Sequence, residues 1–254
     1  MISKSIQMQK LSHITALRGV AILSVLIFHA FPSALPGGYL GVDIFFVISG
    51  FLITSILLRD MENKSFSFAV FYKKRILRLM PAFFALLLLA LIVIALFYLP
   101  NDIRGASNSA RSAIFFNSNM FFAKHLGGYF GSFSEIKPFI HFWSLSIEWQ
   151  FYLAFPLAFF IIFKLFKKAN LLAFWIIFIA IFASTFIHFN VEDSYYLAHF
   201  RALEIMCGVF LALFLQNTSL KSNNKFSSIF LIALILCLFI FSKKLFNAPP
   251  PLLR

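Results

Sequence analysis

The sequence predicts an all-α protein, a polytopic bundle of transmembrane helices. Of its 254 residues, 61% are hydrophobic and only 12% are charged, about half the charged fraction of a soluble globular domain. The mean hydropathy is +0.90, and several apolar runs approach the roughly 20 residues that a helix needs to cross a bilayer. The chain is therefore interpreted as a helical membrane protein.

Seven apolar segments are predicted to span the membrane. The first contains Arg18 and lacks a small-residue cleavage site, so it is interpreted as a retained helix and not a signal peptide. Segment 100–142 has only a short apolar stretch, which contains Asn117 and Asn119, and this favours a re-entrant or interfacial piece over a full span. The predicted spans are 14–32, 39–58, 80–99, 143–165, 170–189, 197–216 and 226–242.

The net charge of +13 would raise the question of nucleic acid on a soluble chain. Here Lys and Arg lie mostly between apolar runs, where the positive-inside rule and anionic lipids explain them. We therefore expect membrane lipids as partners and no nucleic acid. The basic clusters share one side if 100–142 returns to the side it left, which predicts a multi-pass inner (plasma) membrane protein with a cytoplasmic N-terminus.

Arg18 and His29 lie within the first predicted span, where a charged group costs several kcal/mol and marks a candidate functional site. They are eleven residues apart, so they share one helix face, about 16 Å apart along it. Arg18 is expected nearer the cytoplasm and His29 nearer the outer end. Because histidine titrates near neutral pH, His29 suits a general base.

Other ionisable residues are expected at the same outer depth. Asp43 opens the second span, Glu148 falls early in the fourth, and Arg201 and Glu204 fall early in the sixth. Convergence with His29 predicts a catalytic site in which Asp43 or Glu148 orients the imidazole. Simpler interpretations are a structural ion pair between Arg201 and Glu204, at i and i+3, and an Asp43 favoured by the helix dipole.

A basic cluster, Lys73, Lys74, Arg75 and Arg78, precedes the third predicted span. Guanidinium groups form forked hydrogen bonds with phosphate oxygens, so this cluster could hold a phosphorylated cytoplasmic donor. The alternative is that these residues are positive-inside anchors.

Five blocks, in order along the chain, resemble acyltransferase family 3, membrane proteins that include O-antigen and other polysaccharide O-acetylases. The first is similar to the family's motif of Arg, ten residues and His, and the third to its Arg-x-x-Arg motif. Five blocks in the family's order are far more specific than one short motif. They are LRGVAILSVLIFHA (17–30), GGYLGVDIFFVISGFLIT (37–54), FYKKRILRLMP (71–81), HFWSLSIEWQFYLAFP (141–156) and HFRALEIMCGVFLA (199–212).

The resemblance implies a bacterial membrane enzyme that moves an acyl group, usually acetyl, from acyl-CoA to a hydroxyl of a surface polysaccharide or lipid-linked sugar. Acyl-CoA is then a donor substrate, and neither a permanently bound cofactor nor a metal is expected. The resemblance implies Arg18 and His29 as the essential pair, Arg75 and Arg78 as acyl-CoA contacts, and Glu148 and Arg201 as further motif residues. Together with the reasoning from the residues, the candidate sites are His29, Arg18, Asp43 and Glu148 for catalysis, Arg75, Arg78 and Lys74 for acyl-CoA, and Trp143, Ser146, Arg201 and Glu204 for substrate binding.

In the favoured mechanism His29 deprotonates the acceptor hydroxyl, which attacks the thioester directly. The alternative is a covalent acyl-enzyme on Ser146 or on His29 itself. The chain departs from the family at Trp149, where a second acidic residue is common, and this departure puts more weight on Glu148.

The chain ends at Arg254, where family members continue with further helices. We therefore expect one acyltransferase-like domain over 1–254, with about seven helices and an incomplete C-terminal part, and a separate chain is a candidate partner to supply the missing helices. The alternative function is a non-catalytic remnant, or a subunit of a polysaccharide assembly or export system.

Overall fold

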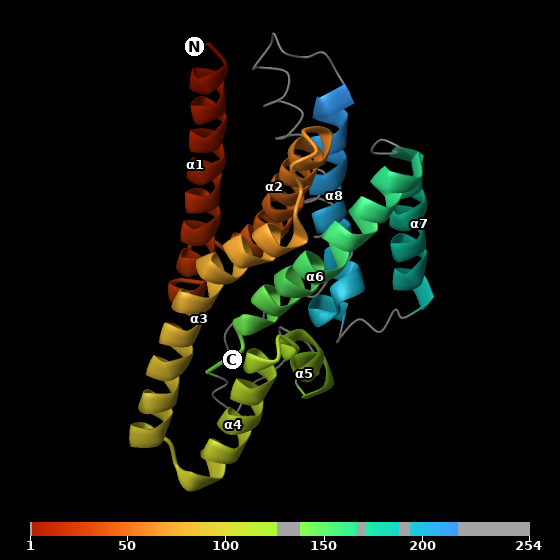
Figure 1. Cartoon of the computed structure of the whole chain (residues 1–254). Helices are drawn as coiled ribbons and strands as arrows, with labels where there is room; N and C mark the ends of the chain where they lie inside the picture. The colour runs from red at the N-terminus through yellow and green to blue at the C-terminus, as the bar shows by residue number, and fades with distance from the viewer. Residues whose placement is uncertain (1, 126–137, 167–170, 188–193, 218–254) are drawn as a thin grey trace. The chain divides into compact units, whose positions relative to one another are not determined.

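A computed structural model describes residues 2–125, 138–166, 171–187 and 194–217 of the protein (Figure 1). Within these ranges the chain forms helices and turns, as predicted. The elements are α1 (Ile2–Ala30), η1 (Gly38–Leu40), α2 (Gly41–Glu62), α3 (Phe68–Phe97), α4 (Pro100–Ile114), α5 (Ser118–His125), α6 (Phe142–Phe166), α7 (Leu171–Ile187), η2 (Ser194–Tyr196) and α8 (Ala198–Asn217).

Five of the described helices are long and apolar enough to cross a membrane, which confirms the predicted fold class. The predicted span 170–189 does form a helix, α7, but its apolar part, Ala173–Ser184, is shorter than the other five. The predicted span 226–242 lies outside the described residues. The five candidate spans are His13–Ala30, Gly38–Glu62, Phe68–Phe97, Phe142–Phe166 and Ala198–Gln216.

The third span begins earlier than the sequence predicted. Hydropathy placed its start at residue 80, after the basic cluster, but α3 begins at Phe68 and contains the cluster and Pro81. Helix formation depends on backbone hydrogen bonds and not on hydropathy, so a helix continues through charged residues beyond the apolar window. Pro81 lacks an amide proton and removes only one helical hydrogen bond. The Arg-x-x-Arg motif is consequently held on the same rigid helix as the span.

Segment 100–142 contains two short helices among its described residues. The 15 residues of α4 and the 8 of α5 are too few to cross a hydrocarbon core. Helix α4 starts with Pro100 at its first turn, where the missing amide proton costs nothing. Among the described residues of this segment neither helix is long enough to be a full span, as expected, and residues 126–137 lie outside the described ranges.

The described helices divide into two compact units. The first unit combines α1, η1, α2 up to Ser55, α7 and α8 from His199 onward; the second contains the end of α2 from Ile56, helices α3 to α6, and η2.

In the first unit α2 and α8 pack closely through glycines (Figure 1). A Cβ atom on Gly50 would clash with the Ile205 carbonyl, and one on Gly208 would clash with the Val47 carbonyl. Small residues of this kind let membrane helices approach at backbone distance. Helix α7 adds to the unit by stacking Trp175 on Phe210 of α8, with ring centroids 4.4 Å apart.

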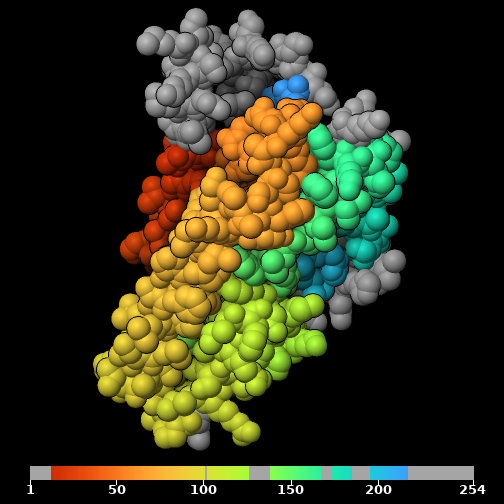
Figure 2. All heavy atoms as spheres, viewed as in Figure 1, coloured from red at the N-terminus to blue at the C-terminus, as the bar shows by residue number. Residues whose placement is uncertain are grey.

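The core of the second unit lies between α3, α4 and α6. Buried Phe83, Leu87 and Ile94 of α3 pack against alanines of α4, together with Phe139. Figure 2 shows the side chains of α3 (yellow) and α4 (yellow-green) side by side. The opposite face of α3 remains apolar and open, with Phe97 77% exposed, as expected for a helix whose outer face contacts lipid.

Candidate functional site

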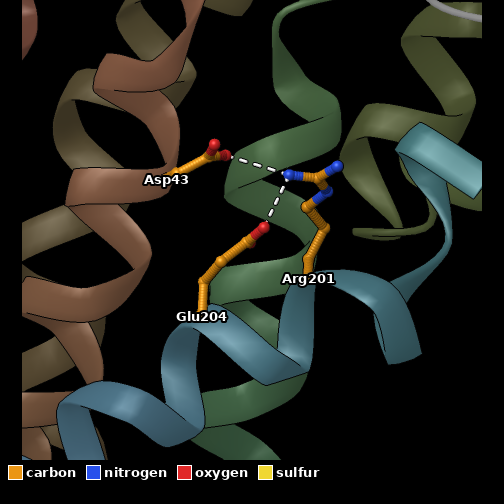
Figure 3. A network of polar contacts seen from close by, with 3 residues as sticks. All are labelled: Asp43, Arg201 and Glu204. Carbon is orange, nitrogen blue, oxygen red and sulfur yellow. Dashed lines mark hydrogen bonds and ion pairs between the residues drawn. The ribbon is translucent and has the colours of Figure 1, made fainter. Parts of the chain in front are cut away.

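A buried arginine is shared by two carboxylates in the first unit (Figure 3). The Nη1 atom of Arg201, in the first turn of α8, donates to Asp43 Oδ1 at 2.9 Å and to Glu204 Oε1 at 2.8 Å. The Arg201 side chain is 0% exposed. The structure confirms the predicted ion pair between Arg201 and Glu204. It also confirms that Asp43 lies in the first turn of its helix. Asp43 is a second ion-pair partner of Arg201.

The glycine contacts explain why Asp43 reaches across to α8. An aspartate side chain is short, so its carboxylate meets an arginine on another helix only where the two backbones approach closely. Gly50 and Gly208 provide that approach. A buried charge without a partner costs several kcal/mol, whereas a paired and hydrogen-bonded charge is tolerated. The ion cluster and the glycine contacts therefore specify the same packing of α2 on α8.

His29 is exposed at the end of α1, and its Nδ1 atom lies 2.8 Å from the Val25 carbonyl oxygen. A carbonyl can only accept, so Nδ1 carries the proton, and in the neutral ring Nε2 carries the lone pair. In this described contact Nδ1 donates to a main-chain carbonyl, where the sequence had suggested a carboxylate partner. This tautomer is the one a general base needs if the acceptor proton is taken by Nε2.

Arg18 lies on the same helix, partly buried, with its guanidinium carbon 5.9 Å from the centre of the Phe45 ring on α2. A cation over an aromatic face is favourable where water is scarce. This contact joins α1 to α2 one turn after Gly41. A Cβ atom on Gly41 would clash with the Ala21 carbonyl and the Ser24 hydroxyl of α1, so the two helices approach closely there.

The second unit contains a separate group of motif residues. The guanidinium carbon of Arg75, on α3, lies 5.5 Å from the centre of the Phe71 ring and 5.8 Å from that of Tyr152 on α6. The Tyr152 hydroxyl donates to Glu148 one turn earlier. Arg75 and Glu148, which the sequence assigned to different parts of the site, are thus joined through a tyrosine. Lys74 and Arg78 are exposed on the same helix.

Ser146 and Trp143, predicted to bind substrate, are both buried in the second unit. The Ser146 hydroxyl donates to the Phe142 carbonyl at 2.9 Å and accepts from the Ser118 amide at 3.3 Å. These contacts fasten the start of α5 to α6. Trp143 is 2% exposed and packs against Tyr195 and Tyr196 of η2, which sequence reasoning did not identify. Their ring centroids lie 5.0 and 5.6 Å from that of Trp143.

Sequence reasoning also missed the contacts that hold the turn between α4 and α5. Phe116 has a positive φ of 51°, an unfavourable conformation for a bulky residue. Gln150 donates to the Phe116 carbonyl at 2.9 Å and to Asn119 Oδ1 at 3.0 Å. Trp149 stacks on the Phe116 ring at 5.1 Å. Trp149, which departs from the family pattern, therefore packs against the turn between α4 and α5. Its position next to Glu148 was the only sequence signal for this contact.

Comparison with known proteins places the chain among acyltransferases. Residues 11–249 match a family described as "Acyltransferase domain". The chain is 34% identical over 221 residues to an uncharacterized protein of Haemophilus influenzae, an alignment that covers 82% of this chain and 90% of that protein. No solved structure matches it.

Two further relatives have named activities. The chain is 35% identical over 213 residues to the O-acetyltransferase OatA of Staphylococcus aureus, covering 82% of this chain and 35% of that protein. It is 34% identical over 206 residues to the peptidoglycan O-acetyltransferase OatA of Listeria monocytogenes, covering 78% and 33%. The alignments thus span about a third of the length of each OatA protein. The match over residues 11–249 shows that the chain belongs to acyltransferase family 3, the membrane family that its five sequence blocks resemble.

Proposed function

We propose that this protein is an integral membrane O-acyltransferase that moves an acyl group, in the simplest case acetyl, from acyl-CoA to a sugar hydroxyl of the bacterial cell envelope. The observation that carries the proposal is the family match over residues 11–249, supported by relatives named as O-acetyltransferases. The motif residues that such an enzyme needs are present and are held on helices.

The donor side of the proposal rests on α3. Coenzyme A carries phosphates, and clustered arginines and lysines are the side chains that bind phosphate best. Arg75 is held by two aromatic rings, while Lys74 and Arg78 are exposed on the same helix. The positive-inside rule assigns this end of α3 to the cytoplasm, where acyl-CoA is made.

The proposed chemistry is a direct transfer. His29 Nε2 takes the proton of the acceptor hydroxyl, and the oxygen attacks the thioester carbonyl carbon. A C–O bond forms, the C–S bond breaks, and the proton passes from the imidazolium to the departing thiolate. Arg18 lies on the same helix, about 16 Å away along it, and its positive charge favours the approach of the anionic donor towards this helix. Arg201, Asp43 and Glu204 keep the helices that surround this chemistry in place.

The proposed acceptor is a hydroxyl of an envelope glycan or of its lipid-linked precursor. The name of the Listeria relative, a peptidoglycan O-acetyltransferase, favours an amino-sugar polymer as the first acceptor to test; an O-antigen sugar of lipopolysaccharide is the next. The proposed location is the bacterial inner membrane, with the N-terminus in the cytoplasm.

The donor half of the proposal can be tested by binding. The purified chain in lipid nanodiscs is titrated with radiolabelled acetyl-CoA, beside the double variant Arg75→Ala, Arg78→Ala. The control is Arg104→Ala, Arg111→Ala, which removes two exposed arginines of α4 and so changes the net charge equally. We expect at least a tenfold weaker affinity in the first double variant and little change in the control, because only the first removes phosphate ligands. Equal losses in both, or no binding by the folded wild type, would refute this donor site.

A further inference from the structure

We propose that Tyr152 is a positioning residue that couples the donor-binding arginine to the motif carboxylate. Its ring holds Arg75, and its hydroxyl holds Glu148. The inference rests on the proposed function and extends it to a residue outside the charged groups of the motifs.

The contacts that support the coupling all lie within the second unit. Tyr152 is 5% exposed, so its ring is fixed between α6 and α3. One end of the side chain donates to Glu148 Oε1, four residues earlier on the same helix. The centre of the ring lies 5.8 Å from the Arg75 guanidinium carbon. Arg75 and Tyr152 lie on different helices, so helical periodicity does not account for this contact. A single side chain therefore contacts a cation and an anion that do not belong to the same helix.

A second aromatic ring further restricts the position of the Arg75 side chain. Phe71 lies one turn before Arg75 on α3, is 5% exposed, and also contacts the guanidinium, at 5.5 Å. Two buried rings restrict where the flexible arginine side chain can lie. An aromatic ring attracts the flat face of a guanidinium, whereas the N–H groups that donate hydrogen bonds lie in the plane of the guanidinium. An arginine held in this way meets a phosphate without first having to be ordered, which favours binding.

The hydroxyl has a different task from the ring. A carboxylate that accepts a hydrogen bond from a buried phenol is held in one orientation. If Glu148 acts in the transfer step, loss of that hydrogen bond misplaces the carboxylate and slows the chemistry, whereas the arginine stays where the ring holds it. The two ends of Tyr152 should therefore affect different kinetic constants.

Two substitutions separate the two ends. Tyr152→Phe removes the hydroxyl and keeps the ring, and Tyr152→Leu removes both. The matched control is Tyr72→Phe, because Tyr72 also joins α3 to α6 through its hydroxyl, which donates to the Leu153 carbonyl at 3.1 Å. All variants are assayed in nanodiscs for acetyl-CoA turnover in the presence of a peptidoglycan acceptor, and their thermal unfolding is recorded.

We expect Tyr152→Phe to lower kcat at least tenfold with KM for acetyl-CoA changed less than threefold. Tyr152→Leu should lower kcat similarly and raise KM at least fivefold. Tyr72→Phe should change each constant less than threefold. In a Glu148→Gln background, Tyr152→Phe should have no further effect on kcat, because coupled residues are not additive; a merely structural tyrosine would give additive losses.

The outcomes separate the coupling from the proposed function. If the wild type turns over acetyl-CoA and Tyr152→Phe matches Tyr72→Phe, the coupling is overturned and the function stands. Additive losses with Glu148→Gln overturn it as well. If the folded wild type neither binds nor turns over acetyl-CoA, the proposed function fails, and the coupling fails with it.

Discussion

Arg201 donates to Asp43 across 158 positions of sequence, at 2.9 Å, and this contact joins α8 to α2 inside a membrane-embedded unit. The same nitrogen also contacts Glu204. One guanidinium thus faces two carboxylates, so the three residues differ in how well the protein should tolerate their loss.

Arg201→Leu should be the most damaging change in the first unit. It leaves two buried carboxylates without their cation, and breaking a buried ion pair from one side costs about 3–5 kcal/mol. We expect little folded protein when the variant is examined by fluorescence-detected gel filtration, and a lower Tm in detergent. The control is Arg59→Ala, which breaks the exposed pair with Asp60 and should cost less than about 1 kcal/mol. Similar losses in both variants would show that burial is unimportant here.

Glu204→Gln should be much milder than Arg201→Leu. It removes one of two like charges beside a single guanidinium, and it can keep a hydrogen bond from Arg201. Among the described residues Glu204 Oε2 has no hydrogen-bond partner, so no hydrogen bond to this oxygen offsets the free-energy cost of its burial. We expect a Tm equal to or above that of the wild type in the same detergent. A fall as large as that of Arg201→Leu would mean that both carboxylates are required.

Gly208→Ala should separate α2 from α8. The added Cβ atom would clash with the Val47 carbonyl, and backbone atoms cannot move aside as a side chain can, so overpacking of about 1–3 kcal/mol is expected. Gly19→Ala on α1 is the control, because nothing described lies within 4 Å of its Cβ position, and it should be neutral or slightly stabilising. Thermal unfolding compares the two. An unchanged Tm in Gly208→Ala would argue against the tight packing.

The two ends of α2 should be accessible from opposite sides of the membrane. In a chain whose Cys207 and Cys237 are replaced by alanine, Ser33→Cys precedes α2 and Ser65→Cys follows it; both positions are exposed. A membrane-impermeant maleimide added to intact cells should label Ser33→Cys, and Ser65→Cys only after the cells are opened, because the basic cluster lies beside residue 65. The reverse pattern would invert the proposed orientation.

Much of this organisation could be predicted from hydropathy and charge. Long apolar runs identified four spans to within a few residues, since burying backbone in lipid forces helix formation. The ion pair of Arg201 and Glu204 was also predictable, because helical spacing alone brings i and i+3 together. The start of α3 was not, because charged residues end a hydropathy window without ending a helix.

The contacts between helices could not be predicted from the sequence. The pairing of Asp43 with Arg201, and of Tyr152 with Arg75, depends on how distant helices pack, and no periodicity within one helix encodes that. Tyr152 did carry a local signal, its position four residues after Glu148. Gly50 and Gly208 carried another, as small residues in apolar helices that favour close packing.

The most direct test of the central claim compares two histidines with the same local geometry. His29 and His125 each hold Nδ1 against the carbonyl four residues earlier, at 2.8 and 2.7 Å, and both are exposed. Membrane vesicles containing the wild type, His29→Ala or His125→Ala are given radiolabelled acetyl-CoA and a peptidoglycan acceptor, and base-labile acetyl ester in the glycan is counted. Acyl transfer through His29 predicts at least a hundredfold loss in His29→Ala and near wild-type transfer in His125→Ala, with equal amounts of inserted protein. Undiminished transfer in His29→Ala would contradict it.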